Sequence, residues 1–270
     1  MDRETRSFWV NSGRAAGGAL IFALPMLMTA EMWELGLEMH RLRLAAFVLL
    51  SVPMLTVLSH FIGFERTTCW RDAAFDALYA LAIGGVIGFA LLTVLAVFRP
   101  PPTLDRMVGQ VAVQSVPAAI GALLARTQFG SETARPPADA GSPYVGEMFL
   151  MGTGALFLGL NIAPTDEIWI LSARMTAWHA IAVVLLSLAT MHAFVYAVGF
   201  RGGSSHSAEL PWSAAFLRFT LPGYAVAAAV SLYVLWVFGG LDGGFDQGVS
   251  AMVVLTLPGA IGAAAARLIV

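Results

Sequence analysis

Long runs of apolar residues, separated by short polar segments, make up most of the chain. Eight of these runs reach or approach the roughly 20 residues that a helix needs to cross the hydrocarbon core of a bilayer. They cover about residues 15–33, 44–63, 73–98, 107–125, 146–163, 178–199, 215–238 and 249–268. The pattern predicts an all-α, polytopic protein with eight transmembrane helices, whose main partner is the lipid bilayer.

Two related motifs lie at the ends of the first and fifth predicted helices. Thr29-Ala30-Glu31-Met32-Trp33 recurs 136 residues later as Thr165-Asp166-Glu167-Ile168-Trp169, and the match extends without a gap over residues 18–65 and 154–201. Chance similarity between apolar helices would preserve scattered Leu and Ala, but not a Thr, a Glu and a Trp in one register. The sequence therefore predicts an internal duplication.

The duplication defines the expected architecture. A second repeated block, Pro117–Ala122 and Pro258–Ala263, lies in the fourth and eighth helices. We expect a first four-helix repeat at residues 1–130, a cytoplasmic linker at 131–143 and a second four-helix repeat at 144–270. Because each repeat has an even number of helices, both enter the membrane in the same sense, as parallel repeats related by a pseudo-twofold axis along the membrane normal.

Arginine positions predict the orientation, because cytoplasmic loops are enriched in positive charge. One side of the predicted membrane holds most of the Arg residues: Arg3, Arg6, Arg14, Arg66, Arg71, Arg126, Arg135, Arg201, Arg218 and Arg267. The other side holds Arg41, Arg43, Arg99, Arg106 and Arg174. Both termini are therefore expected in the cytoplasm.

The composition supports a membrane location and excludes several kinds of chemistry. Hydrophobic residues make up 58% of the chain and charged residues 12%, and the net charge of −2 gives no sign of a nucleic-acid partner. All 15 basic residues are Arg. Since a retinal or pyridoxal Schiff base needs a Lys amine, these cofactors are excluded, and no cofactor is expected. Cys69 is the single cysteine, so an intramolecular disulfide and a cysteine-based metal site are excluded.

Four segments carry a resemblance to known sequences: Glu31–Gly36, Ser59–Phe64, Ala163–Glu167 and Met191–Arg201. They resemble a family of bacterial integral membrane proteins whose function is uncharacterised. The resemblance covers nearly the whole chain. It implies a location in the bacterial inner membrane and no particular activity.

The repeated acidic residues are the first candidates for a functional site. Glu31 and Glu167 lie at the outer ends of the first and fifth helices, beside Glu34 and Asp166. The expected twofold axis would bring up to four carboxylates to one mouth. Such a mouth would attract a small cation, favour Ca²⁺ or another divalent ion, or raise one carboxylate pKa into the range for proton transfer. The alternative is structural, with the Thr and Glu of each motif capping local helix ends and the Trp anchoring at the interface.

Polar side chains near interrupted or kinked helices are further candidates for ion binding, because such interruptions form binding sites in transporters. Pro25 in the first helix and Pro164 after the fifth interrupt the same region of each repeat. The polar residues concerned, including two that follow one face of the fourth helix, are Thr29, Thr165, Asn161, Gln110 and Gln114.

Histidines and charged residues deeper in the chain form a second set of candidates. In the register of the repeat, Thr56 corresponds to His192 and His60 to Tyr196, so each half has a His and a hydroxyl four residues apart on one helical face. Such groups relay protons or gate by protonation, or alternatively form an interhelical hydrogen bond. An ion pair is expected near the cytoplasmic helix ends, between Asp76 and Arg126, where it fixes the helices or forms an inner gate.

These features favour a cation channel or a proton- or ion-coupled transporter, with an outer site at the two repeated glutamates and a proton-sensitive element at the two histidines. Two other classes stay open. One is an intramembrane enzyme acting on a lipid or isoprenoid, with His and a carboxylate as acid and base. The other is a non-catalytic membrane sensor or assembly protein. The sequence specifies no particular ion or metal, and a homodimer would suit the chain although no residue demonstrates one.

Overall fold

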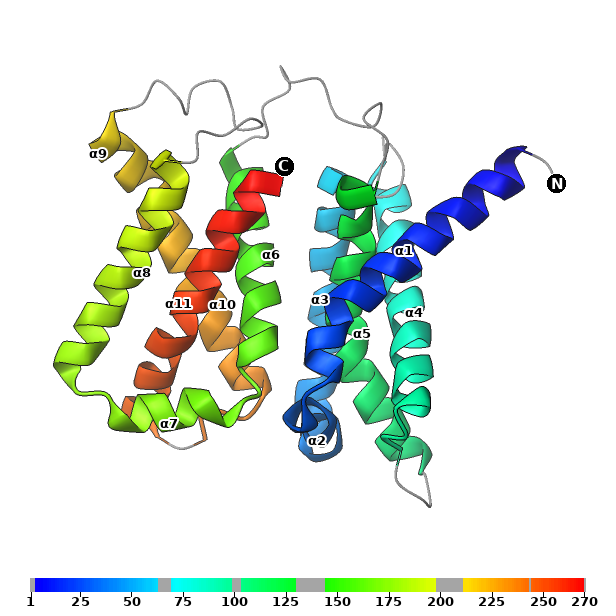
Figure 1. Cartoon of the computed structure of the whole chain (residues 1–270), viewed down its shortest axis with the longest axis horizontal. Coiled ribbons are helices and arrows are strands. Elements are labelled where there is room, and N and C mark those ends of the chain that lie inside the picture. Colours follow the sequence, from blue (N-terminus) through cyan, green and yellow to red (C-terminus); the bar gives the residue numbers. More distant parts are fainter. Residues whose placement is uncertain are drawn as a thin grey trace. The chain divides into compact units, whose positions relative to one another are not determined.

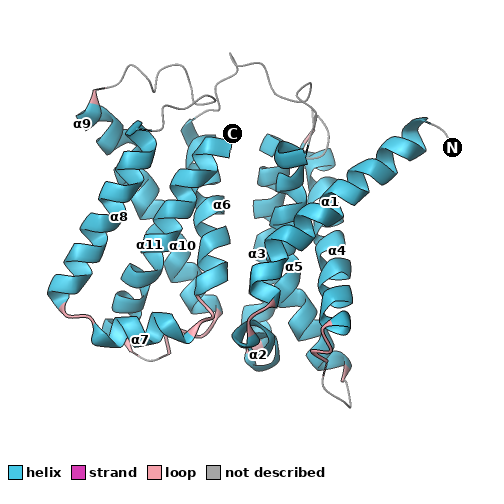
Figure 2. Cartoon of the chain, viewed as in Figure 1, coloured by secondary structure: helices cyan, strands magenta, loops and turns pink. Residues whose placement is uncertain are grey.

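The computed structural model describes residues 3–62, 69–98, 103–129, 144–197, 211–242 and 244–269. Within these ranges helices are joined by short turns and there is no strand (Figure 2). The predicted all-α class is confirmed. The chain divides into two compact units, residues 1–134 and 135–270, and the linker predicted at 131–143 lies outside the described residues.

The first unit is organised around its last helix (Figure 1). Its helices are α1 (Arg3–Leu27), α2 (Ala30–Glu38), α3 (Arg41–Ile62), α4 (Trp70–Val94) and α5 (Leu104–Phe129). α5 packs against the other four, and every residue from Val113 to Leu123 is buried. A helix surrounded on all sides has room only for small residues at its closest contacts, which explains Ala118, Ala119, Gly121 and Ala122.

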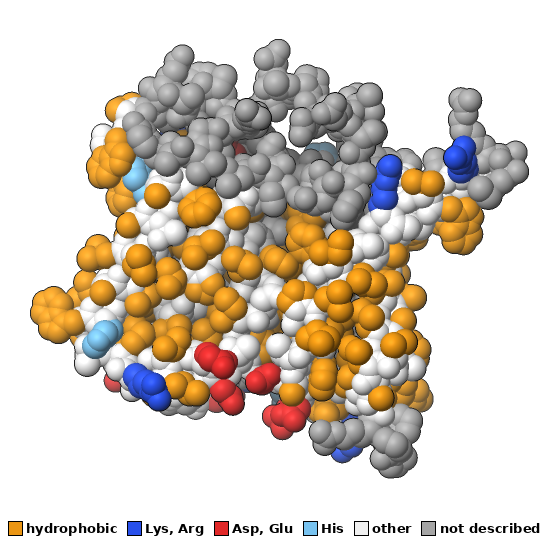
Figure 3. Space-filling view, in the orientation of Figure 1, with side chains coloured by type: hydrophobic (Ala, Val, Ile, Leu, Met, Phe, Trp, Pro, Cys, Tyr) orange, Lys and Arg blue, Asp and Glu red, His pale blue; other side chains and the backbone are white. Residues whose placement is uncertain are grey.

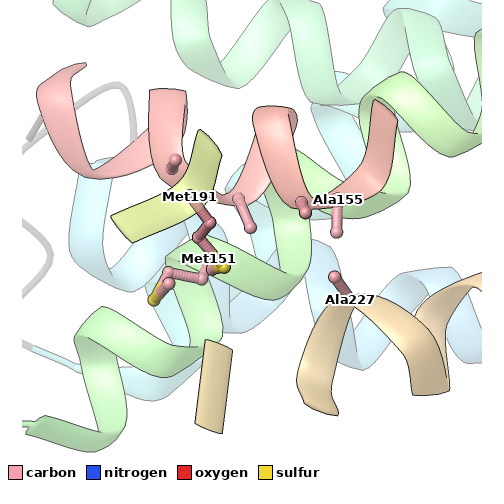
Figure 4. Packing of buried hydrophobic residues seen from close by; sticks show 7 residues of the cluster. Met151, Ala155, Met191 and Ala227 are labelled. Atoms are coloured by element: carbon pink, nitrogen blue, oxygen red, sulfur yellow. The ribbon is translucent and has the colours of Figure 1, made fainter. Parts of the chain in front are cut away.

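In the second unit the last helix has the same central position (Figure 1). The elements are α6 (Tyr144–Ile162), α7 (Asp166–Arg174), α8 (Ala177–Ala197), α9 (Trp212–Ala215), the π-helical segment η2 (Phe216–Thr220), α10 (Leu221–Val237) and α11 (Phe245–Ile269). α11 packs against α6, α7, α8 and α10. Figure 4 shows the core of this unit, where alanines of α11 and α10 pack beside Met151 and Met191.

Seven helices of the described chain are long and apolar enough to cross a membrane: α3, α4, α5, α6, α8, α11 and the continuous stretch Trp212–Val237. An eighth span results when α1 and α2 count together, although the chain bends by 89° between them. In each unit hydrophobic side chains cover the flanks of the helices, and charged side chains gather at the helix ends (Figure 3). The chain is a multi-pass integral membrane protein.

The first membrane helix differs from the expectation of one helix over residues 15–33. It ends at Leu27, and a second short helix begins at Ala30. Pro25, which lies in the last turn of α1, marks the region of the break. The break places Glu31 and Trp33 on α2, so the acidic motif belongs to a short helix that is nearly perpendicular to the one before it.

Glycines let two helices cross closely in each unit. A Cβ on Gly121 of α5 would lie 2.6 Å from the carbonyl oxygen of Gly18 on α1. In the second unit a Cβ on Gly154 of α6 would lie 2.6 Å from Cβ of Ala266, and closer still to the carbonyl oxygen of Gly262 on α11. Gly18 with Gly154 and Gly121 with Gly262 are the pairs that the sequence repeat aligns. The crossings agree with the expected duplication, which stays a prediction, as does the twofold axis.

Candidate functional site

The corner between α1 and α2 is held by two residues of the first acidic motif. Thr29 Oγ1 donates a hydrogen bond to the carbonyl oxygen of Met26 (2.8 Å). Trp33 Nε1 donates to the carbonyl oxygen of Leu27 (2.7 Å). Both acceptors belong to the last turn of α1, whose carbonyls have no partner within the helix. Thr29 and Trp33 therefore stabilise the end of α1 and the sharp turn after it.

The corner between α6 and α7 repeats part of this arrangement. Thr165 Oγ1 donates to the carbonyl oxygen of Ile162 (2.8 Å), which is the position equivalent to Met26 in the repeat. Trp169 instead packs on Gly240, where a Cβ would lie 2.7 Å from its ring. In both motifs the Thr closes the preceding helix and does not cap the following one with its side chain. Each Thr side chain therefore caps the C-terminal end of the preceding helix, and not the N-terminal end of the following one.

The repeated glutamates lie at the same position of two short helices. Glu31 is the second residue of α2 and Glu167 the second residue of α7. Glu31 is half-buried, and Glu167 is exposed, as are Glu34 and Asp166. Negative charge in the first turn stabilises a helix by about 0.3–1 kcal/mol. Among the described side chains, neither glutamate has a hydrogen-bond or ion-pair partner, so both carboxylates are available to a cation.

Gln110 connects the first corner with the centre of the unit. Its Nε2 donates to the carbonyl oxygen of Trp33 (3.3 Å), and its side chain is 5% exposed. The backbones are close here, because a Cβ on Gly36 of α2 would lie 2.6 Å from Cα of Gln110. Asn161, the polar candidate beside the second corner, donates to the carbonyl oxygen of Phe157 on its own helix (2.7 Å).

Gln114 lies one turn further along α5 and is fully buried. Its Cβ would be 3.4 Å from a Cβ on Gly88 of α4, so the side chain lies at the α4–α5 contact. In the part of the chain that the structure describes, neither its amide nitrogen nor its amide oxygen has a hydrogen-bond partner. A buried polar group without a partner costs about 1–3 kcal/mol. Within a membrane such a group is tolerated where it meets water or a ligand.

Replacing Gln114 by Leu is expected to leave the free energy of unfolding unchanged or to raise it by up to about 3 kcal/mol, because no protein hydrogen bond is lost. Gln110→Leu is the matched variant. It removes the bond to the Trp33 carbonyl and is expected to lower the free energy of unfolding by about 1 kcal/mol. Thermal unfolding of both variants in one detergent measures the difference. Equal losses of stability would contradict the assignment of Gln114 as an unpaired group.

In the first unit the predicted histidine and carboxylate lie on neighbouring helices. His60 of α3 stacks on Trp70, the first residue of α4, with ring centroids 4.3 Å apart. Ser59 Oγ donates to Asp76 Oδ2 of α4 (3.3 Å). Thr56, which was expected to act with His60, donates to the carbonyl oxygen of Val52 instead (2.8 Å). Hydroxyls within helices often bond to the preceding turn in this way.

In the second unit the predicted histidine joins two helices. His192 Nδ1 of α8 is 2.8 Å from Thr220 Oγ1 of η2, and the two atoms share a hydrogen bond. The imidazole also lies edge-on to Trp212, with ring centroids 4.9 Å apart. An interhelical hydrogen bond was one of the two expected roles of this residue. Each unit thus has a His beside the Trp that opens the next described helix.

Glu147 of α6 is a buried charged residue outside the motifs that the sequence pattern points to. It is 6% exposed and lies inside a candidate membrane span. The available signal was its position as the single charged residue of the apolar run from Tyr144 to Ile162. Thr220 was missed as well, because only the folding of η2 against α8 brings its hydroxyl to His192.

Two predicted residues are not described. The side chains of Arg126 and Tyr196 lie outside the described part of the structure, so the expected Asp76–Arg126 ion pair stays a prediction. Among the described residues no group of three or more His, Cys, Asp or Glu side chains forms a metal site. The convergence of the four acidic residues from both motifs also stays a prediction.

Comparison with known proteins places the chain in a family. The family model described as "Putative integral membrane protein (DUF2391)" matches residues 11–270. No curated protein and no solved structure matches the chain. Since the family model spans almost the whole length, from the middle of α1 to the end of α11, the chain belongs to this family of integral membrane proteins.

Proposed function

We propose that this protein transports a small cation across the membrane, as a channel or as a proton- or ion-coupled transporter. The observation that carries the proposal is the buried amide of Gln114, in the middle of the central helix of the first unit, which has no hydrogen-bond partner among the described residues. A closed bundle would gain stability from an apolar side chain at this position. A polar group that meets water or an ion during transport explains why a Gln stands there.

Polar groups of the first unit occur at the helix break and at two successive turns of α5 in the interior. Glu31 lies at the start of α2, and the Trp33 carbonyl accepts a hydrogen bond from Gln110. Gln114 follows one turn later on the same face of α5. Interrupted helices form binding sites in transporters, because freed backbone groups at the interruption bind the ion.

The proposal includes the features that the sequence predicts for the whole protein. The duplicated architecture would give each unit a short helix after its first long one, with a glutamate at its second position, as α2 and α7 have. The arginine distribution would place these glutamates on the outer side of a bacterial inner membrane, with both termini in the cytoplasm.

Flux measurements on the purified protein in liposomes test the proposal. We expect selective flux of at least one ion when H⁺, K⁺, Na⁺ and Ca²⁺ are compared across pH, and no flux in liposomes prepared without protein. Helical content by circular dichroism confirms that the reconstituted protein is folded. Absence of flux for every ion from folded protein would contradict transport. It would favour the intramembrane enzyme or the sensor, and co-purifying lipids would be the next observation to make.

A further inference from the structure

The buried carboxylate of the second unit lies on the face of α6 that packs against η2 and α10. Tyr144 Oη donates to the carbonyl oxygen of Arg218 (2.7 Å). Seven residues further along α6, Met151 packs at Gly223, where a Cβ would lie 3.2 Å from its Sδ. Residues spaced by three and then four positions share one face of a helix. Glu147 therefore lies between these two contacts, opposite the last turn of η2.

Thr220 connects this level of α6 to α8. It is the last residue of η2, and its Oγ1 shares the 2.8 Å hydrogen bond with His192 Nδ1. His192 directly follows Met191, and Figure 4 shows Met191 next to Met151 in the core. The α6–α10 contact at Met151 and the packing of Met191 beside it thus place His192 near the same depth as Glu147. His192 and Thr220 are in contact, and the spacing along α6 places Glu147 at about the same depth in the unit.

All three side chains are buried inside the unit. Glu147 and His192 are each 6% exposed, and Thr220 is fully buried. A buried carboxylate and a buried imidazolium both lose solvation, which costs several kcal/mol per charge when uncompensated. One proton shared between the two groups compensates much of this cost. The pair is then either a neutral carboxylic acid beside a neutral imidazole, or a carboxylate beside an imidazolium of opposite charge.

Few other ionisable groups occur on the described elements around His192. On α6 and α10 they are the phenols Tyr144, Tyr224 and Tyr233, and on η2 the guanidinium Arg218. Arg218 is exposed and lies over the rings of Tyr144 and Phe219, 5.8 Å and 5.7 Å from their centroids. α9 has none, and α11 contributes Asp246 at its opposite end, the side chain of Arg267 being outside the described residues. Glu147 is thus the carboxylate at this level in the described part of the unit.

The π-helical segment η2 carries two of the residues that contact His192. π-helices are rare, occur mostly as single turns inside α-helices and are frequent at functional sites. In η2 the widened turn brings two side chains to the same imidazole: the ring of Phe216 lies 5.3 Å from His192, and Thr220 bonds to it. The turn therefore fixes the orientation of the imidazole next to the level of Glu147.

We infer that Glu147, His192 and Thr220 form a buried proton-binding site in the second unit, and that H⁺ is the ion that the protein moves. The part about transport rests on the proposed function, whereas proton binding does not. Without the bound proton, the site holds a carboxylate and a neutral imidazole. One proton taken up from water converts the Glu147 carboxylate to a carboxylic acid beside a neutral imidazole, and release of that proton restores the carboxylate. The Thr220 hydroxyl both donates and accepts, so it follows either state of His192.

Infrared difference spectroscopy of the reconstituted protein between about pH 8 and about pH 5, the range in which His titrates, tests proton binding. We expect a carboxylic acid C=O band that develops on acidification, shifts in D₂O and is lost in Glu147→Gln. Asp246→Asn, which changes an exposed carboxylate of the same unit, should leave the band unchanged. Glu147→Asp keeps the carboxyl group and should retain a shifted band, even if Glu147→Gln fails to fold. A band that is the same in native protein and in Glu147→Gln, or that Glu147→Asp abolishes while folded, overturns the site.

The imidazole gives a second measurement. With ¹⁵N-labelled histidine, the midpoint of the His192 titration should move by about one pH unit or more when Glu147 becomes Gln or Asp, as expected for coupled groups. An unchanged midpoint overturns the coupling.

Proton flux separates this inference from the proposed function. Loss of H⁺ flux in Glu147→Gln, with intact flux in Asp246→Asn, supports H⁺ as the transported ion. Flux of another ion that Glu147→Gln leaves unchanged overturns that assignment while transport stands. If folded native protein conducts no ion, the transport function fails, and the infrared result alone decides the proton site.

Discussion

Replacing Glu31 and Glu167 together by Gln is expected to lower cation flux by roughly tenfold to a thousandfold at low ionic strength. Carboxylates at an entrance raise the local concentration of cations, and these two have no described partner that would neutralise their charge. Gln preserves the size of each side chain and removes only the charge. The difference from native protein should shrink as salt rises from about 0.01 M to about 1 M, because the Debye length falls from about 30 Å to about 3 Å.

Glu38→Gln is the matched control for this experiment. Glu38 is an exposed glutamate on the same helix as Glu31, but it is the last residue of α2, far from the break. It should leave flux within about twofold of native, as expected for a surface charge that is largely screened. Unchanged flux and selectivity in the double variant would contradict the placement of the entrance at the repeated motifs. A purely structural role of the glutamates would then account for their recurrence.

Gly154→Ala is expected to destabilise the second unit by about 1–3 kcal/mol or more, the usual cost of overpacking a core. The new methyl group would meet Cβ of Ala266 at 2.6 Å and the carbonyl oxygen of Gly262 at a still shorter distance. The carbonyl oxygen of Gly262 is part of the α11 backbone, and the Cβ of Ala266 is fixed to it. Neither atom can move away by a change of rotamer. α6 and α11 would have to move apart along the crossing. Thermal unfolding in detergent, followed by circular dichroism, measures the effect.

Gly159→Ala provides the matched control on the same helix. No atom lies within 4 Å of a Cβ at this position. The substitution therefore adds helix propensity without a clash and is expected to stabilise the protein by up to about 1 kcal/mol. The same chemical change thus has opposite signs at two positions five residues apart. Equal effects would contradict the close crossing of α6 and α11.

The helices were predictable from the sequence to different extents. The long apolar runs gave the transmembrane helices, since hydropathy and length are local properties of the chain. The sequence also placed Pro25 near an interruption, but not the separate helix α2. α2 forms where it does because Met32 and Gly36 pack against the centre of the unit, with Gly36 at the backbone of Gln110. That contact joins residues more than 70 positions apart in the chain.

The candidate site was predictable in its residue types and less so in its pairings. Gln110 and Gln114 were recognisable as polar positions on one face of a helix, and the structure places both in the interior. His60 and Thr56 share a helical face, yet Thr56 bonds to its own backbone and His60 stacks on Trp70. Spacing along a helix shows which side chains point the same way, but the neighbouring helix decides which of them meet a partner.

Three properties can be read from the chain alone: the all-α membrane class, the repeated acidic motif and the absence of lysine. These properties follow from composition and from short-range order, which do not depend on how the helices pack. Three others depend on helix packing: Gln114 is buried without a described partner, Thr29 closes the helix before it, and His192 shares a hydrogen bond with Thr220. The reason is geometric: these facts depend on the rotation and depth of each helix against helices that lie far away in the sequence.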